Sequence, residues 1–207
     1  MRIKSKRFIQ NRFLRDDVEQ GRWKPGTFVF YRLELPFKDA VSQIPNLEDR
    51  IQQSESGKHI KIQNLDHPKD DVNFMFLYNA IFIAAPDPTR TITLEDAASF
   101  PSERVFIASL WHSFAGFIYL TIEDDPIGSG VKVGAIAGIG VLPKYRGKKI
   151  GLILIKQAIE YFRGKGVEKL ICEVYQENEP SLRMFQGLGM KIVGHMILDE
   201  QNEKMDV

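Results

Sequence analysis

The residues best suited to chemistry lie in the segment VLPKYRGKKIG, residues 141–151, where an apolar stretch leads through a basic, glycine-containing turn into a helical pattern. The first N–H groups of a helix have no acceptor inside the helix, and the helix dipole adds positive potential there. Arg146, Lys148 and Lys149 add full positive charges. The segment therefore predicts an anion site able to hold a pyrophosphate, with a solvated basic turn as the alternative.

The same segment differs from two common phosphate-binding patterns. It has neither the GxxxxGK[ST] arrangement of a triphosphate-binding loop nor the GxGxxG arrangement of dinucleotide-binding folds. This argues against a nucleoside triphosphatase and against a nicotinamide-dependent enzyme.

A second group of reactive side chains lies in CEVYQEN, residues 172–178. Side chains alternate between the two faces of a strand, so Glu173 and Tyr175 share one face and Cys172 takes the other. Glu173 either takes part in chemistry or faces solvent or a lysine, and Tyr175 is either catalytic or an ordinary strand aromatic. Cys172 has no evident histidine partner, which favours a buried, inert thiol.

Three elements must position these groups. Residues 131–142 are expected to form a strand, residues 148–163 a helix with apolar side chains at helical spacing, and residues 167–175 another strand. A strand, a crossover helix and a strand make a βαβ unit whose two strands are parallel. The three glycines of the first strand either admit a ligand close to the backbone or mark bulges.

The rest of the chain is expected to alternate short strands and helices. Strands are predicted over residues 27–35, 58–66, 104–112, 115–123 and 190–198, and helices over residues 71–85 and 94–99 and just after Asn178, as its N-cap. The strands at 104–112 and 115–123 should form a hairpin around Ser113 and Phe114. The apolar run at 74–85, interrupted by Tyr78 and Asn79, favours a buried helix.

The composition is that of a globular protein: of 207 residues, 43% are hydrophobic and 27% charged, which argues against disorder. The net charge of +1 provides no general attraction to nucleic acid or anionic lipid, so nucleic-acid binding through the basic first 15 residues is the outsider. The single cysteine indicates a reducing compartment, and we expect a cytoplasmic protein. The longest apolar run is shorter than the roughly 20 residues of a membrane span, so no membrane partner is expected.

The order of these segments resembles the GNAT superfamily of acetyl-CoA-dependent N-acetyltransferases: a strand, the RGKKIG turn, a long helix, the strand ending CEVYQEN, and PSLRMFQGLGM. In that family the turn reads Arg or Gln, two residues, Gly, one residue, Gly or Ala; here Lys149 replaces the first glycine. The resemblance covers roughly residues 58–198 and implies acetyl-CoA as cosubstrate and an amine as acceptor. It implies a cofactor site of Ile139, Gly140 and Val141 at the pantetheine arm, Arg146, Gly147, Lys148, Lys149, Ile150, Gly151 and Leu152 at the pyrophosphate, and Asn178 and Phe185 at the arm.

The resemblance also implies a mechanism, in which an amine attacks the thioester, a base removes its proton and an acid can protonate the departing thiolate. It places Glu173 where peptide N-terminal acetyltransferases have their glutamate base, and no metal is required. It places Phe185, which has no proton to donate, at the family's tyrosine. The thiolate then leaves unassisted or is protonated by Tyr175 or water; alternatively, the chain is a catalytically degenerate module that binds coenzyme A or acyl-CoA in a regulatory or assembly role.

The fold class expected is α/β (α+β), with a mixed central sheet flanked by helices. The GNAT domain is expected over residues 58–207, after an extension at 1–57. A GNAT sheet ends with two strands after its last helix, and this chain has one. We expect residues 27–35, whose FYRLELP resembles a terminal GNAT strand, to complete the sheet from the same chain or from a swapped neighbour, as a monomer or homodimer.

Overall fold

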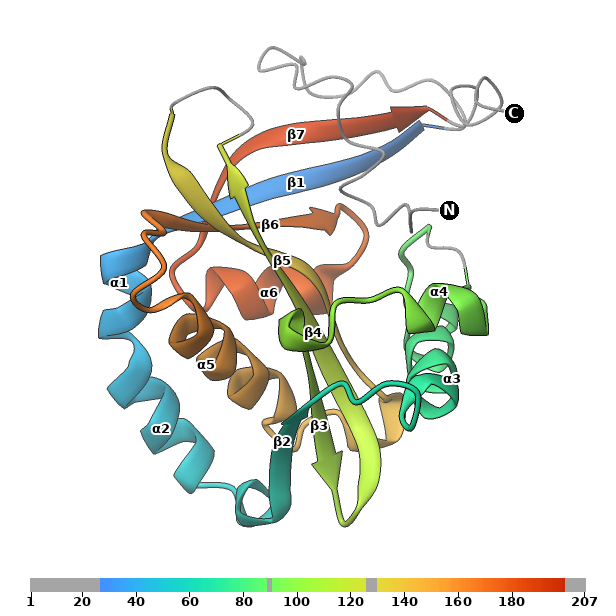
Figure 1. Ribbon diagram of the computed structural model, residues 1–207. Coiled ribbons are helices and arrows are strands. Elements are labelled where there is room, and N and C mark those ends of the chain that lie inside the picture. Colours follow the sequence, from blue (N-terminus) through green and yellow to red (C-terminus); the bar gives the residue numbers. More distant parts are fainter. Residues whose placement is uncertain (1–26, 89–90, 126–129, 200–207) are drawn as a thin grey trace.

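The protein is described by a computed structural model that covers residues 27–88, 91–125 and 130–199. These residues form a seven-stranded sheet in the order β2-β3-β4-β5-β6-β1-β7 (Figure 1). The strands are β1 (Thr27–Pro36), β2 (Ile60–Asn64), β3 (Val105–Leu110), β4 (Ser113–Asp124), β5 (Lys132–Val141), β6 (Lys169–Tyr175) and β7 (Lys191–Asp199). In this described sheet β5 and β6 are parallel, as a βαβ unit requires, and the other neighbouring strands are antiparallel.

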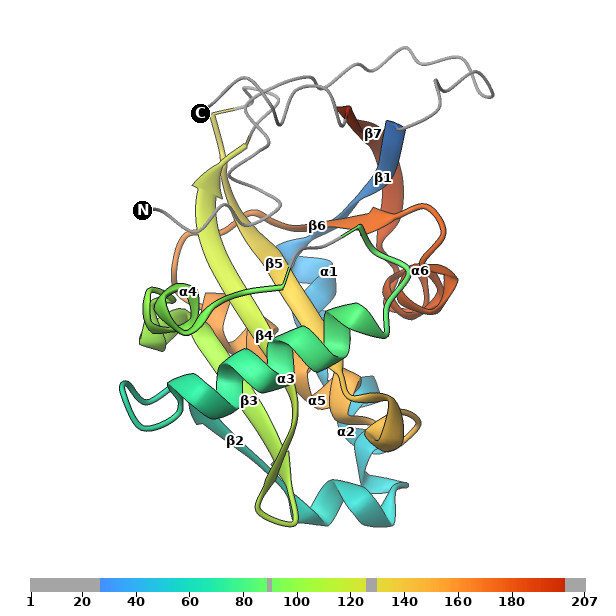
Figure 2. The ribbon, with the colours of Figure 1, turned by 90° about the vertical axis from the view of Figure 1, so that its right-hand side faces the viewer.

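Helices cover both faces of the sheet (Figure 2). One face carries α3 (Asp71–Ile83) and α4 (Leu94–Ala98), and the other carries α1 (Phe37–Ser42), α2 (Ile44–Gln52) and α5 (Ile150–Phe162). The remaining elements are α6 (Glu179–Gln186) and the short 3₁₀ turns η1 (Glu55–His59), η2 (Ser102–Arg104) and η3 (Pro143–Tyr145). This architecture confirms the expected α/β (α+β) class.

The strand β6 shows how alternation builds the two layers. Leu170, Cys172 and Val174 pack into the same core as Phe162 of α5, while Ile171 belongs to a separate cluster on the opposite face. The faces predicted for this strand and the apolar face predicted for the long helix are therefore confirmed, and the Cys172 thiol is buried.

The strand β1 lies between β6 and β7, although it comes first among the described strands. It is antiparallel to both neighbours, with Leu33 opposite Cys172 in β6 and Ile192 in β7. The expectation that residues 27–35 complete the sheet is confirmed, and the pairing is within one chain. Because Leu33 and Leu47 share the core with α5, the described part of the extension is packed into the domain. A domain boundary after residue 57 stays a prediction.

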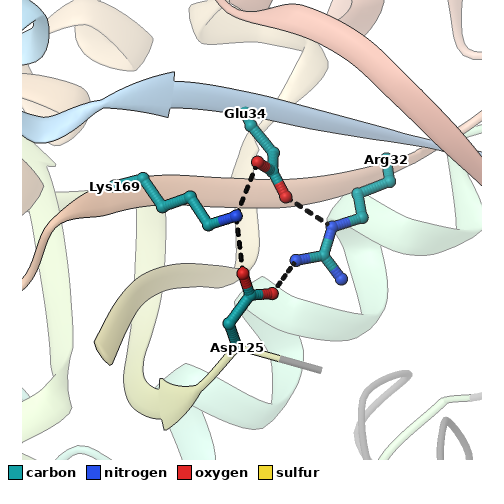
Figure 3. A network of polar contacts seen from close by, with 4 residues as sticks. All are labelled: Arg32, Glu34, Asp125 and Lys169. Carbon is teal, nitrogen blue, oxygen red and sulfur yellow. Dashed lines mark hydrogen bonds and ion pairs between the residues drawn. The ribbon is translucent and has the colours of Figure 1, made fainter. Parts of the chain in front are cut away.

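Four charged side chains hold β1 on the sheet face away from α5 (Figure 3). Arg32 contacts Glu34 at 2.9 Å and Asp125 at 3.0 Å, and Lys169 contacts the same two carboxylates at 2.8 and 2.6 Å. Burial alone would lower the pKa of Lys169, but its hydrogen bonds to Asp125 and Glu34 outweigh this and raise the pKa. A buried charge without its partner is costly, so the network favours this position of β1.

The hairpin of β3 and β4 forms as expected, but its turn lies two residues earlier than predicted. Leu110 pairs with Ser113, so Trp111 and His112 make the turn, with φ angles of 49° and 66°. Tight two-residue hairpin turns require positive φ because this matches the twist of the strands. Bulky side chains rarely adopt such angles, and the sequence therefore carried no turn signal at this position.

The apolar run at residues 74–85 forms α3, but the prediction of a buried helix is wrong for its outer face. Phe74, Leu77 and Ile81 face the core, whereas Phe76 and Ile83 are 62% and 74% exposed. Apolar residues lie all around this helix, so their spacing could not indicate which face points inward.

Two further findings concern only the residues that the structure describes. They include no helix long and apolar enough to cross a membrane. They also include no cluster of three or more His, Cys, Asp or Glu side chains that could hold a metal ion. The basic first 15 residues, considered above for nucleic-acid binding, lie outside the described ranges.

Candidate active site

The strands β5 and β6 separate after a short paired stretch and leave an opening in the sheet. They pair from Val133 opposite Lys169 to Ile136 opposite Cys172, and beyond this point β5 pairs only with β4 in the described sheet. A cavity of about 570 Å³ lies where the two strands part, lined by residues of α3, β4, β5, α5, β6 and α6. Backbone groups on the facing strand edges are available there to an extended ligand.

The basic turn forms the end of this cavity at the start of α5. Within the described part of the chain, the backbone N–H groups from Gly147 to Gly151 donate to no protein acceptor. The Arg146 Nε donates to the Val141 carbonyl at 3.3 Å, which ties the turn to the end of β5. Consecutive N–H groups at a helix start, beside Arg146 and Lys149, suit a pyrophosphate.

Lys149 is the N-cap of α5 and adopts the left-handed conformation, with φ 65° and ψ 7°. A residue with a side chain costs about 1–2 kcal/mol in this conformation, which gives a physical reason for a glycine at this position of the turn. The helix nevertheless begins regularly, because the Lys149 carbonyl accepts from the N–H groups of Leu152 at 3.0 Å and Ile153 at 3.2 Å.

The three glycines of β5 are explained mainly by helix packing. A Cβ at Gly134 would lie 2.9 Å from the Phe162 ring, and a Cβ at Gly140 would lie 2.2 Å from Cγ2 of Ile81. A Cβ at Gly138 would meet no atom closer than 3.7 Å. Gly134 and Gly140 thus allow helices to approach the strand, which neither of the two explanations offered from the sequence included.

Glu173 and Tyr175 share a strand face as predicted, but of the two only Glu173 lines the cavity. Glu173 is half-buried and lies just beyond the point where β5 and β6 part. Tyr175 is buried against Phe30 and Met196. Burial raises the pKa of the Tyr175 hydroxyl, and so does the Glu177 carboxylate with which it hydrogen-bonds. The catalytic use of Tyr175 stays a prediction, without support from the cavity wall.

Asn178 is the N-cap of α6, as predicted, and also reaches across the cavity. Its Oδ1 accepts from the Ser181 N–H at 3.2 Å, and its Nδ2 donates to Asp87 at 2.5 Å. Asp87 follows α3, and both Asn178 and Asp87 line the cavity. One amide hydrogen of Asn178 remains for a ligand.

Arg50, Tyr78 and Asp87 line the cavity but were not identified from the sequence. The Tyr78 ring stacks on Phe117 with centroids 5.4 Å apart. Burial, followed by the charges of Asp87 and Asp96, raises the pKa of the Tyr78 hydroxyl well above its usual value, so it stays protonated at neutral pH. A tyrosine inside an apolar run was the available signal; Arg50 and Asp87 lie in ordinary polar stretches.

Most of the predicted site residues meet in this one cavity. Lining it are Ile139, Gly140, Val141, Arg146, Gly147, Lys149, Ile150, Gly151, Leu152, Glu173, Asn178 and Phe185. Besides Tyr175, the exception is Lys148, which lies over the Trp111 ring at 5.7 Å from its centroid. Phe185 is 2% exposed.

The fold, the parted strands and the turn before α5 define a class of protein. Residues 73–190, more than half of the chain, match the model of the acetyltransferase (GNAT) family. The chain belongs to this family, which confirms the resemblance seen in its motifs.

Individual relatives are distant. The mycothiol acetyltransferase of Thermobifida fusca (strain YX) is 24% identical over 173 residues, which are 78% of this chain and 53% of that protein. The solved aminoglycoside acetyltransferase AAC(6')-Iy, in complex with a bisubstrate analogue containing CoA, has a TM-score of 0.57 at 21% identity, over 68% of this chain and 96% of that one. A GCN5-related N-acetyltransferase from Sphaerobacter thermophilus has a TM-score of 0.58 at 15% identity, over 83% of this chain and 50% of that one. These two structures share the fold, and the chain spans about half the length of the curated relatives it matches.

Proposed function

We propose that the protein transfers an acetyl group from acetyl-CoA to a primary amine of a small molecule, a peptide or a protein N-terminus, by direct attack in a ternary complex. The observation that carries this proposal is one cavity that joins the N–H groups at the start of α5, the parted strands and the Glu173 carboxylate. These features correspond to the anionic end, the extended arm and the reacting end of acetyl-CoA.

The residues present fit acetyl-CoA. The N–H groups from Gly147 to Gly151, with Arg146, would hold the pyrophosphate. The open edge of residues 139–141 in β5 would bond the amides of the pantetheine arm, as a neighbouring strand would. The remaining amide hydrogen of Asn178 would assist. When bound, the thioester supplies an activated acetyl group.

Glu173 would act as the general base. An acceptor amine arrives largely protonated at neutral pH, and the carboxylates of Glu173 and Asp87 in the cavity favour a cation. Transfer of one proton to Glu173, directly or through a water molecule, frees the nitrogen lone pair for attack on the thioester carbonyl.

The departing thiolate needs little assistance, because a thiol with a pKa of about 8.5 is already a good leaving group. Tyr78, whose raised pKa keeps its hydroxyl protonated, lines the cavity and could supply the proton that Phe185 cannot. The named relatives are acetyltransferases, and the comparisons do not favour the catalytically degenerate alternative.

Calorimetric titration with acetyl-CoA, followed by measurement of thiol release with a panel of amines and alanyl peptides, tests the proposal. We expect Glu173→Gln to lower kcat by about 100-fold or more while changing the Kd for acetyl-CoA by less than about twofold. Glu168→Gln, at an exposed glutamate just before β6, is the matched control and should stay active. Equal turnover by wild type and Glu173→Gln would exclude Glu173 as the base. A folded protein that does not bind acetyl-CoA would refute the proposal as a whole.

A further inference from the structure

Arg50 lies in the last turn of α2, outside the residues 73–190 that match the family model. Its side chain nevertheless lines the cavity together with Gly147, Lys149 and Gly151, the residues that surround the start of α5. A cation from the N-terminal segment is therefore present at the phosphate end of the candidate site.

The position of Arg50 is set by the packing of α2 along α5. Leu47 is fully buried in the core shared with α5, and Glu48 pairs with Lys156 in the middle of α5 at 2.8 Å. Because Glu48 lies beside Lys156, and Arg50 lines the cavity with Gly151, α2 runs antiparallel to α5 (Figure 1). The end of α2 thus reaches the beginning of α5.

The guanidinium of Arg50 has no protein partner. Among the described residues it forms no ion pair or hydrogen bond, and the adjacent Glu48 is engaged by Lys156. A cation in the last helical turn interacts favourably with the helix dipole, which explains an arginine at this position. The dipole does not require the side chain to line the cavity, so a ligand is the better explanation of its direction.

Acetyl-CoA carries a second anionic group beyond its pyrophosphate, the phosphate on the ribose 3′ oxygen. The N–H groups from Gly147 to Gly151 and the Arg146 side chain already suit the pyrophosphate. We propose that Arg50 binds the 3′-phosphate, so that α2 completes the coenzyme site. The inference rests on the proposed function. A guanidinium suits this role because it can donate two parallel hydrogen bonds to one phosphate.

Arg183 of α6 also lines the cavity and is the competing cation. It is paired with Glu179 at 3.2 Å, and both side chains are more than two-thirds exposed. A phosphate would have to displace this carboxylate and compete with water, whereas Arg50 is half-buried and has no carboxylate to displace.

Calorimetric titration of wild type, Arg50→Gln and Arg50→Lys with acetyl-CoA and with 3′-dephospho-acetyl-CoA tests this inference. We expect wild type to bind acetyl-CoA about 10- to 100-fold more tightly than the dephospho form, and Arg50→Gln to lose most of that preference. Its affinity for the dephospho form should change by less than about twofold, and Arg50→Lys should keep part of the preference.

Arg163→Gln is the matched control, because it removes the same charge from an exposed side chain just after the far end of α5, about 20 Å away. It should keep the wild-type preference. An equal loss of affinity for both ligands in Arg50→Gln, or no loss for either, would overturn the assignment to the 3′-phosphate. If wild type binds neither ligand, the proposed function fails; if it binds both and Arg50→Gln retains the preference, only the role of Arg50 fails.

Discussion

The guanidinium Nη2 of Arg32 lies 3.0 Å from Oδ1 of Asp125, and the two side chains are 3% and 0% exposed (Figure 3). The pair joins β1 to the residue that follows β4, 93 positions further along the chain. With Glu34 and Lys169 it balances two positive and two negative charges in a buried place. The strand that completes the sheet is thus held by ion pairs as well as by its backbone.

Arg32→Met should lower the free energy of unfolding by about 3–5 kcal/mol, because it leaves Asp125 and Glu34 buried with Lys169 as the remaining cation. Urea denaturation measures this loss. Arg183→Met removes an exposed pair with Glu179 and should cost less than about 1 kcal/mol. Similar losses in the two variants would contradict a special role for the buried network.

The stability of the region around α3 should depend on pH through His67. One ring nitrogen contacts the Asp71 carboxylate and the other lies 2.8 Å from the Phe100 carbonyl oxygen. Burial lowers the pKa of His67, but these two hydrogen bonds outweigh it and raise the pKa above its usual 6.5. The stabilisation is therefore complete below about pH 6.5 and is lost as the pH rises through the raised value.

The expected result is that His67→Gln costs more stability at about pH 5.5 than at about pH 8.5. Urea unfolding of wild type and variant across this range measures the difference. A cost that is the same at every pH would show that His67 contributes by packing or neutral hydrogen bonds rather than by its charge.

Lys149→Gly should stabilise the protein by about 0.5–1 kcal/mol, because the relief of the left-handed strain exceeds the entropic cost of a glycine. Thermal unfolding measures the change, and binding of acetyl-CoA should be retained. Lys148→Gly, at the neighbouring position without a positive φ, is the control and should bring no gain. A loss of stability in Lys149→Gly would mean that the lysine side chain contributes more than its backbone angle costs.

Gly140→Ala and Gly138→Ala should differ sharply, although the residues are two apart in one strand. The added methyl at Gly140 would lie 2.2 Å from Ile81, so the contact between β5 and α3 must shift, at a cost of about 1–3 kcal/mol. At Gly138 the nearest atom is 3.7 Å away, and the cost should stay below about 1 kcal/mol. Melting temperatures compare the two; equal shifts would refute the packing explanation.

Local elements and the phosphate-binding turn could be predicted from the sequence because they depend on neighbouring residues. The apolar spacing of α5, the alternation in β6 and the cap at Asn178 each involve positions within a few residues of one another. The insertion of β1 was predictable as well, since a sheet short of one strand would leave an open edge. The Trp111–His112 turn was missed because strand pairing, and not its own residues, imposes the positive φ angles.

The composition of the cavity depended instead on contacts between distant segments. Arg50, Tyr78 and Asp87 reach Glu173 and Asn178 only because α2 packs on α5 and the end of α3 meets the start of α6. Strand alternation placed Tyr175 on the face of Glu173 but could not show that aromatic packing keeps it off the cavity wall. Such positions result from side-chain packing across more than 90 residues of chain, for which no local pattern in the sequence carries a signal.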